Sequence, residues 1–221
     1  MKVLTAALGL LFFTIAAEAQ GPAILSTDVF RYPLNRETTE AFKATCAALA
    51  ENPVVRGNFE QEKIISRLNR SLKSSGNFII TSELGMVWET LKPFPSTLVL
   101  GKDYLVQGRP GGQKTVLNAA GNETFIRFAE VISAVFSGQT EGLLENFDVF
   151  YKGVPAAWEL GLLPHDKAIS SFAGSISLAG GDAIRIIVIH EQNGDAIIYN
   201  MSNHEYSSRL NAHEKTFFQI P

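Results

Sequence analysis

The feature that most constrains this chain is the stretch from residue 54 to residue 100, where apolar side chains recur at every second position. Val55, Phe59 and Ile65 share one parity in its first part, and the pattern returns in the segments FIIT and GMVWETL. Strands have this period because successive side chains point to opposite faces of a sheet. The stretch therefore predicts an antiparallel meander with one large apolar face, and such a face needs a cover.

Polar interruptions divide this meander. The first is Ser74–Gly76, and the second is Lys92–Ser96, which contains Pro93 and Pro95. Proline cannot donate a hydrogen bond to a central ladder, and small polar residues favour turns. We expect a turn at each interruption.

The later part of the chain predicts more strands and short helices. Asn193-Gly194-Asp195 is a strong signal for a two-residue hairpin turn. Proline at position 164 is expected to end a strand that carries Trp158, Leu160 and Leu162 on one parity. The further strands are expected at 104–107, 114–118, 148–153, 156–164, 175–180, 183–192 and 196–202, with helical turns at 140–147 and 165–172.

The first helix is expected at Arg36–Glu51. Phe42 and Cys46 recur there at helical spacing, and Asn52-Pro53 would end the helix. Thr38 or Thr39 could supply the side-chain oxygen that caps its first turn.

A second helix is expected at 122–136, where the hydrophobic period changes from two to steps of three and four. Phe125, Phe128, Ile132 and Phe136 follow these steps, and other apolar residues widen the stripe. A helix that is apolar over so much of its surface is expected to be buried or to lie against an oily surface. We therefore expect it to act as a movable cover for the sheet.

Residues 1–19 have the pattern of a secretory signal peptide. Lys2 precedes an apolar run at Leu8–Ala17, and Ala17-Glu18-Ala19 is a small-x-small exit. Cleavage is expected near Ala19, which leaves 20–221 as a single periplasmic domain. The only cysteine is Cys46, so neither a lipid anchor next to the signal nor an internal disulfide is expected.

Composition argues against several classes of function. The net charge is −3 without a basic stripe, so nucleic acid is a poor candidate partner. Fifteen phenylalanines stand against 2 tryptophans and 5 tyrosines. Phenylalanine adds apolar area without a polar group, which suits a core or an oily cavity.

Motifs that carry catalysis or metal binding are not found in the sequence. There is no nucleophile elbow, phosphate loop or dinucleotide fingerprint. Four histidines, none with metal-ligand spacing, are expected to be solvated at strand ends: His165, His190, His204 and His213. Glu60 and Glu62 are expected to lie on a solvated strand face and not to act as an acid–base pair. We therefore expect no catalytic residues, no metal and no cofactor, and we do not expect an enzyme.

The residues carry a resemblance to the LolA-type periplasmic lipoprotein carrier family. It rests on V-x-G-x-F-x-Q-x-K at Val55–Lys63, Ser75-Gly76-x-Phe78, Trp88 in the third strand, and the two prolines before Leu98–Leu100. The later Leu162-x-Pro164, the ISL strand and the closing hairpin fit the same order. The match covers nearly all of residues 36–205.

This resemblance implies a mainly β fold with α: an unclosed half-barrel of about eleven antiparallel strands whose concave apolar face is covered by helices. It also implies a monomeric carrier that takes the acyl chains of lipoproteins from an inner-membrane donor complex to an outer-membrane acceptor. The chain departs from the family at one point. Members carry Lys-Arg-Pro shortly before the strand tryptophan, and that arginine ties the lid shut, whereas Ser82–Val87 contains no basic residue.

Taken together, these patterns give a set of candidate residues for a lipid cavity: Phe59, Phe78, Ile80, Trp88, Leu98, Leu100, Phe125, Phe128, Ile132, Phe136 and Trp158. Three alternatives stay open. The first is a lipid-sensing regulatory or scaffold domain on the same fold. The second is a carrier of a glycolipid or another envelope lipid. The third is a hydrolase that acts on lipids, which turnover of acyl esters would reveal.

Overall fold

A computed structural model describes residues 27–219, except 102–103, 110–114, 118–130, 132, 136–137, 139, 166 and 171–172. It contains one sheet of eleven strands in the order β6-β5-β4-β3-β2-β1-β11-β10-β9-β8-β7. Every neighbouring pair is antiparallel. The order is linear, with β6 and β7 at its two edges, so the sheet is open. The predicted mainly β half-barrel with added helices is confirmed.

The strands and helices have the following bounds. The strands are β1 (Val54–Ile65), β2 (Arg70–Thr81), β3 (Gly85–Lys92), β4 (Ser96–Leu100), β5 (Leu105–Gly108), β6 (Thr115–Leu117), β7 (Phe147–Val154), β8 (Ala157–Pro164), β9 (Ser175–Gly180), β10 (Ile184–His190) and β11 (Ala196–Ser207). The helices are η1 (Thr27–Arg31), α1 (Arg36–Ala50), η2 (Ser66–Leu68), α3 (Thr140–Asn146), α4 (Lys167–Ser170) and α5 (Ala212–Phe217). No helix in the described part of the chain has the length and apolar content to cross a membrane.

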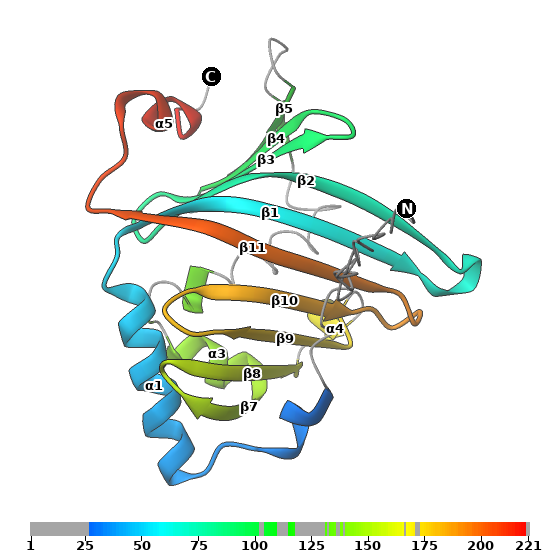
Figure 1. Ribbon diagram of the computed structural model, residues 1–221, viewed down its shortest axis with the longest axis vertical. Coiled ribbons are helices and arrows are strands. Elements are labelled where there is room, and N and C mark those ends of the chain that lie inside the picture. The colour runs from blue at the N-terminus through cyan, green and yellow to red at the C-terminus, as the bar shows by residue number, and fades with distance from the viewer. Residues whose placement is uncertain are drawn as a thin grey trace, which may run out of the picture.

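Two faces of the sheet carry separate clusters of apolar side chains. The face that we call inner carries Phe59, Trp88 and Leu160 in one large buried cluster, together with Phe42 and Cys46 of α1. The other face, called outer, carries a small cluster formed by Val87, Val99 and Val106 and contacted by Phe217 and Phe218 at the C-terminal end. The helices therefore divide: α1 covers the inner face near β7, and α5 lies by β3–β5 at the far end of the sheet (Figure 1).

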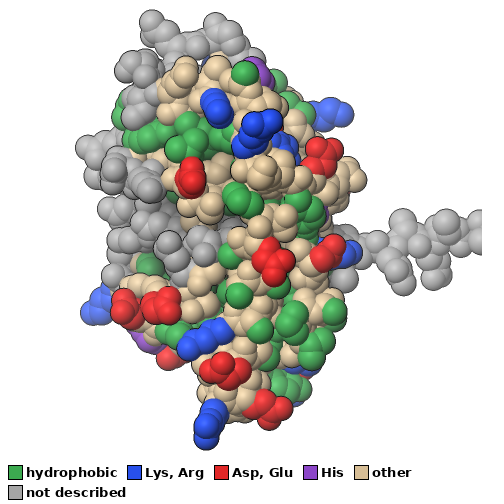
Figure 2. Space-filling view, turned by 90° about the vertical axis from the view of Figure 1, so that its left-hand side faces the viewer, with side chains coloured by type: hydrophobic (Ala, Val, Ile, Leu, Met, Phe, Trp, Pro, Cys, Tyr) green, Lys and Arg blue, Asp and Glu red, His purple; other side chains and the backbone are tan. Residues whose placement is uncertain are grey.

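Register shifts interrupt the ladders at three places: Arg56–Asn58 on β1, Ser75–Gly76 on β2 and Ile184–Ile186 on β10. Such irregularities bend a strand and increase the local twist. They therefore help an open sheet to curve toward a half-barrel. On the face drawn in Figure 2, acidic and basic side chains are interspersed and hydrophobic side chains lie between them.

Two local predictions are wrong. Ser74–Gly76 is not a turn, because β2 runs straight through it and Gly76 pairs with Phe59 of β1. The chain turns earlier, through η2 to Asn69, whose φ of 47° is left-handed. The N-cap of α1 is Asn35 rather than Thr38 or Thr39; its side chain accepts a hydrogen bond from the backbone N–H of Thr38, and the Thr38 hydroxyl accepts one in return.

Two other turns lie where the sequence placed them. The Lys92–Ser96 turn joins β3 to β4, and Pro93 follows a cis peptide bond. Gly194 has a φ of 85° in the turn before β11, where the Asn193 side chain accepts a hydrogen bond from the N–H of Asp195 at 2.8 Å. The turn thus uses a left-handed glycine and a side-chain cap. Residues 191–195 separate β10 from β11, so the turn is longer than the predicted two-residue hairpin.

Candidate functional site

An aromatic cluster lies at the centre of the inner face. The rings of Phe59 and Trp88 stack at 4.1 Å between centroids, although they stand on β1 and β3 with β2 between them. Gly76, opposite Phe59 on β2, places no side chain between the two rings. The ring of Phe78, which is paired with Trp88, lies 6.1 Å from the Trp88 ring at an interplanar angle of 24°. The structure therefore brings three of the sequence-predicted residues into one stack.

Aliphatic candidates continue this surface toward the β5 end of the sheet. Leu98 is paired with Trp88, and Leu100 with Met86. Leu100 is 8% exposed, and Ile80 on β2 is 2% exposed. All belong to the inner apolar cluster or pack against it. The inner face is therefore continuous and closely packed from β1 to β4.

Trp158 is not part of the aromatic stack. It stands on β8, which β2, β1, β11, β10 and β9 separate from β3. Its indole N–H donates to the carbonyl of Gly181 at 2.9 Å, which fixes the ring at the end of the β9–β10 turn. Trp158 thus belongs to the same apolar cluster but holds the opposite end of the sheet.

The expected covering helix falls mostly outside the described residues, and so do its candidates Phe125, Phe128, Ile132 and Phe136. The helical residues that are described at its end are residues 131 and 133–135. Val131 and Val135 are 3% and 1% exposed and belong to the inner cluster. The end of this segment therefore packs on the same face as the aromatic stack.

Helix α1 is fastened to the inner face by a buried hydrogen bond. The hydroxyls of Thr45 and Tyr151 lie 2.6 Å apart, and the ring of Phe42 packs beside Tyr151 at 6.0 Å. Burial raises the pKa of the neighbouring Cys46 thiol to about 12, so this thiol is protonated at neutral pH and is a poor nucleophile.

Two residues outside the set of cavity candidates complete the aromatic cluster. For one of them, His204, the expectation of a solvated position at a strand end is wrong, because it is partly buried within β11. Tyr199 on β11 meets Trp88 edge-on at 5.3 Å, and burial raises the pKa of its hydroxyl. His204 meets the ring of Phe78 edge-on at 5.7 Å. Burial lowers the pKa of His204, and its Nε2 is buried with no hydrogen-bond partner among the described residues. The alternation in AIIYNMS could have placed Tyr199 on the inner face, whereas nothing local marks His204.

The other three histidines lie at strand ends or on the surface. His165 contacts Asp148 at 2.8 Å, and this hydrogen bond raises the pKa of His165. His190 ends β10, and His213 lies on α5. In the part of the chain that the structure describes, no three His, Cys, Asp or Glu side chains gather as a metal site would require.

The position where the LolA-type family carries its basic motif is here a turn. Residues 82–84 connect β2 to β3, and the Thr81 hydroxyl accepts hydrogen bonds from the N–H groups of Leu84 at 2.8 Å and Gly85 at 3.0 Å. Gly85 has a φ of 110° there. The described residues of this turn include no basic side chain.

Neither a protein-family model nor a curated protein sequence matches the chain. Solved structures match its fold. A LolA superfamily protein from Nitrosomonas europaea is 8% identical, with 83% of this chain and 98% of that chain covered, at a TM-score of 0.48. MucB is 12% identical, with 86% of this chain and 64% of that chain covered, at a TM-score of 0.49. LprF from Mycobacterium bovis is 9% identical, with 81% of this chain and 97% of that chain covered, at a TM-score of 0.36.

At these identities and TM-scores the likeness is one of fold alone. This chain itself has a linear order of eleven antiparallel strands, and its helix α1 packs on the inner face. That is the arrangement implied by the motifs at Val55–Lys63 and Ser75–Phe78. The chain is LolA-like in fold.

Proposed function

We propose that this protein is a periplasmic carrier that shields acyl chains on the inner face of its sheet. The observation that carries the proposal is the continuous apolar surface around the Phe59–Trp88 stack, which belongs to the same buried cluster as Val131 and Val135. An acyl chain would bind against this aromatic floor. The signal-like residues 1–19 support a periplasmic location.

The energetics of this exchange favour a carrier over an enzyme. Burying one methylene stabilises by about 0.8 kcal/mol, so a sixteen-carbon chain gains roughly 12 kcal/mol before ordering costs are subtracted. Apolar walls supply this gain without a reactive group. The departure from the family arginine at Ser82–Val87 fits a cover held by apolar contacts, which releases cargo more readily than one tied by hydrogen bonds.

Fluorescence quenching can test where a lipid binds, because the protein has only 2 tryptophans. Trp158→Phe leaves Trp88 as the only reporter, and Trp88→Phe leaves Trp158. A dibrominated stearic acid quenches indoles that its chain touches. We expect saturable quenching in the protein that retains Trp88, competition by unbrominated stearic acid, and much weaker quenching in the protein that retains Trp158.

Equal quenching of both tryptophans, or none in folded protein, would contradict the proposal. The inner face would then be only a core, and the regulatory or scaffold alternative would be favoured. Mass spectrometry of lipid co-purified from the native host separates the possible cargoes. Lipoprotein acyl chains would support transfer from an inner-membrane donor to an outer-membrane acceptor, whereas a glycolipid would support the glycolipid carrier.

A further inference from the structure

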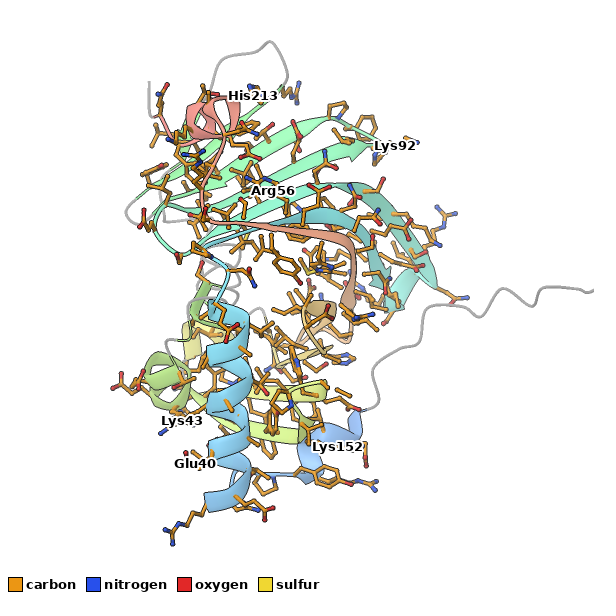
Figure 3. The ribbon with its side chains drawn as sticks, turned by 60° about the vertical axis from the view of Figure 1, so that its left-hand side comes forward. Glu40, Lys43, Arg56, Lys92, Lys152 and His213 are labelled. Carbon is orange, nitrogen blue, oxygen red and sulfur yellow. The ribbon has the colours of Figure 1, made fainter. Side chains whose placement is uncertain are left out.

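The outer face of the sheet holds a cavity, on the side of the sheet opposite the inner aromatic stack. Its volume is about 340 Å³, in the range of small-molecule sites. Strands β1, β2, β3 and β11 form its floor, and α5 forms one wall. Figure 3 shows Arg56 on the sheet beside α5, which carries His213. The residues that line this outer cavity all belong to the described part of the chain.

A row of amide side chains crosses the floor of the outer cavity. Asn203 donates to the carbonyl oxygen of Asn58 at 2.7 Å, and Asn58 donates to Asn77 at 2.7 Å. Asn77 donates to a carboxylate oxygen of Glu89 at 3.4 Å. The register explains the row, because Asn58, Asn77 and Glu89 are direct neighbours on β1, β2 and β3.

This row leaves hydrogen-bonding capacity unused. Each carboxamide has two N–H donors and an oxygen with two lone pairs. Among the described residues, each of Asn203, Asn58 and Asn77 uses one N–H within the row. The second N–H of each, the free lone pairs and the Glu89 carboxylate are therefore available to a ligand that both donates and accepts hydrogen bonds.

The positive charge beside the cavity is already matched. The guanidinium of Arg56 forms a two-pronged ion pair with Glu214 of α5 and also donates to Ser207 at 2.8 Å. Glu89 and Glu205 line the same cavity. The lining is thus acidic on balance, and it disfavours phosphates, sulfates and carboxylates as ligands.

The opposite part of the lining is apolar. Ile79 and Val87 face the cavity from the sheet, and Phe217 faces it from α5. The imidazole of His213 stands edge-on to Phe217 at 5.3 Å. A ligand that fits must therefore present hydroxyl groups to the amide row and carbon–hydrogen surface to the apolar side.

We propose that the outer cavity binds a neutral saccharide unit. A sugar ring is the common ligand that combines a hydroxylated rim with apolar faces, and its hydroxyls donate and accept equally well. A small cation could also meet Glu89 and Glu205, but it would leave the spare amide N–H groups unpartnered. The site lies on the face opposite the acyl-chain site, so the inference does not depend on the proposed carrier function.

NMR titration of the full chain can test this proposal, because ¹⁵N labelling lets the side-chain NH₂ groups of Asn58, Asn77 and Asn203 be followed directly. The probes are glucose and N-acetylglucosamine as neutral sugars, glucose 6-phosphate as an anion, and ethanolamine as a cation. We expect saturable shifts of these three signals with at least one neutral sugar. We expect weaker binding of the phosphorylated sugar than of glucose.

Substitutions separate the outer cavity from the rest of the surface. Asn77→Ala removes the middle of the row and should weaken the bound sugar about tenfold. Asn200→Ala removes the same side chain from β11 outside the cavity and should leave binding unchanged, which controls for general effects. Glu89→Gln keeps the shape of the row and should retain sugar binding.

Three results would overturn the proposal. The first is an absence of sugar-induced shifts up to the solubility limit of both neutral sugars. The second is a response to ethanolamine alone, with loss of that response in Glu89→Gln, which would assign the cavity to a cation. The third is equal weakening by Asn77→Ala and Asn200→Ala, which would place the sugar elsewhere.

Discussion

Gly76→Ala should destabilise the protein severely, because the β2–β3 contact leaves no room for a methyl group. A Cβ at position 76 would lie 1.9 Å from the carbonyl oxygen of Glu89 and 2.9 Å from the Cα of Thr90. Carbon and carbonyl oxygen approach to about 3.3 Å in sheets, so the backbone of β3 would have to move by more than about 1 Å. The obstacle is backbone, which cannot rotate away as a side chain can.

The expected loss can be estimated from the two consequences of that movement. Overpacking a well-filled site costs about 1–3 kcal/mol. Separating β3 from β2 also weakens ladder hydrogen bonds, each worth about 1 kcal/mol. We expect Gly76→Ala to lower the free energy of unfolding by about 3 kcal/mol, measured by urea denaturation with circular dichroism. The loss should include the stack of Phe59 on Trp88, and thus the near-ultraviolet signal of Trp88.

Gly142→Ala is the matched control. It makes the same chemical change in α3, where a Cβ meets nothing within 4 Å. Alanine is the better helix former by about 1 kcal/mol, so this variant should be slightly more stable than the wild type. A Gly76→Ala protein within about 0.5 kcal/mol of wild type would refute the reasoning, since changes that small are typical of unconstrained surface positions.

Three further outcomes follow from buried groups. The hydrogen bond from Arg56 lowers the pKa of Glu214 below its usual value. The ion pair should therefore stabilise the docking of α5 fully above the unfolded pKa of about 4.3, and this stabilisation should be lost as pH falls through the lower folded pKa. Hydrogen exchange in α5 during acid titration measures this loss, and Glu214→Gln should abolish the pH dependence. The Cys46 thiol, with its raised pKa and its buried position, should react with a disulfide reagent at pH 8 only after urea is added, and prompt reaction of folded protein would contradict its burial. Thr45→Val should cost about 1–3 kcal/mol by leaving the Tyr151 hydroxyl unpaired, whereas adding Tyr151→Phe should recover part of that loss in a double-mutant cycle.

Alternation was enough to predict the inner face of the sheet. Phe59, Trp88 and Leu100 lie in the inner cluster, at positions that the period of two makes inward-facing. The prediction of a turn at Ser74–Gly76 from its small polar residues is wrong, because β2 continues through this segment. The structure needs a residue without a side chain at position 76 for the neighbouring strand to approach, and that requirement comes from β3 rather than from the local sequence.

The outer cavity could not have been predicted from local patterns. Asn58 and Asn77 look like ordinary solvated strand positions until the register pairs them. Helix α5 is only six residues long and has no long apolar stripe. Its position depends on the contact between Arg56 and Glu214, which are 158 residues apart in the chain. Contacts of that kind arise from the assembled sheet, and sequence periodicity does not reveal them.

An open sheet has two edges, and each exposed edge is a template onto which another chain can add a strand. At the β7 edge this chain supplies its own cover. Tyr32 accepts a hydrogen bond from the N–H of Tyr151 at 3.0 Å, Leu34 donates to Val149 at 3.2 Å, and Pro33 stands between them without a donor of its own. At the other edge, the described residues of β6 number three. The segment Tyr32–Leu34, which contains Pro33, and the short strand β6 thus protect the protein from edge-to-edge aggregation. Substitution of Pro33 by valine would test this protection.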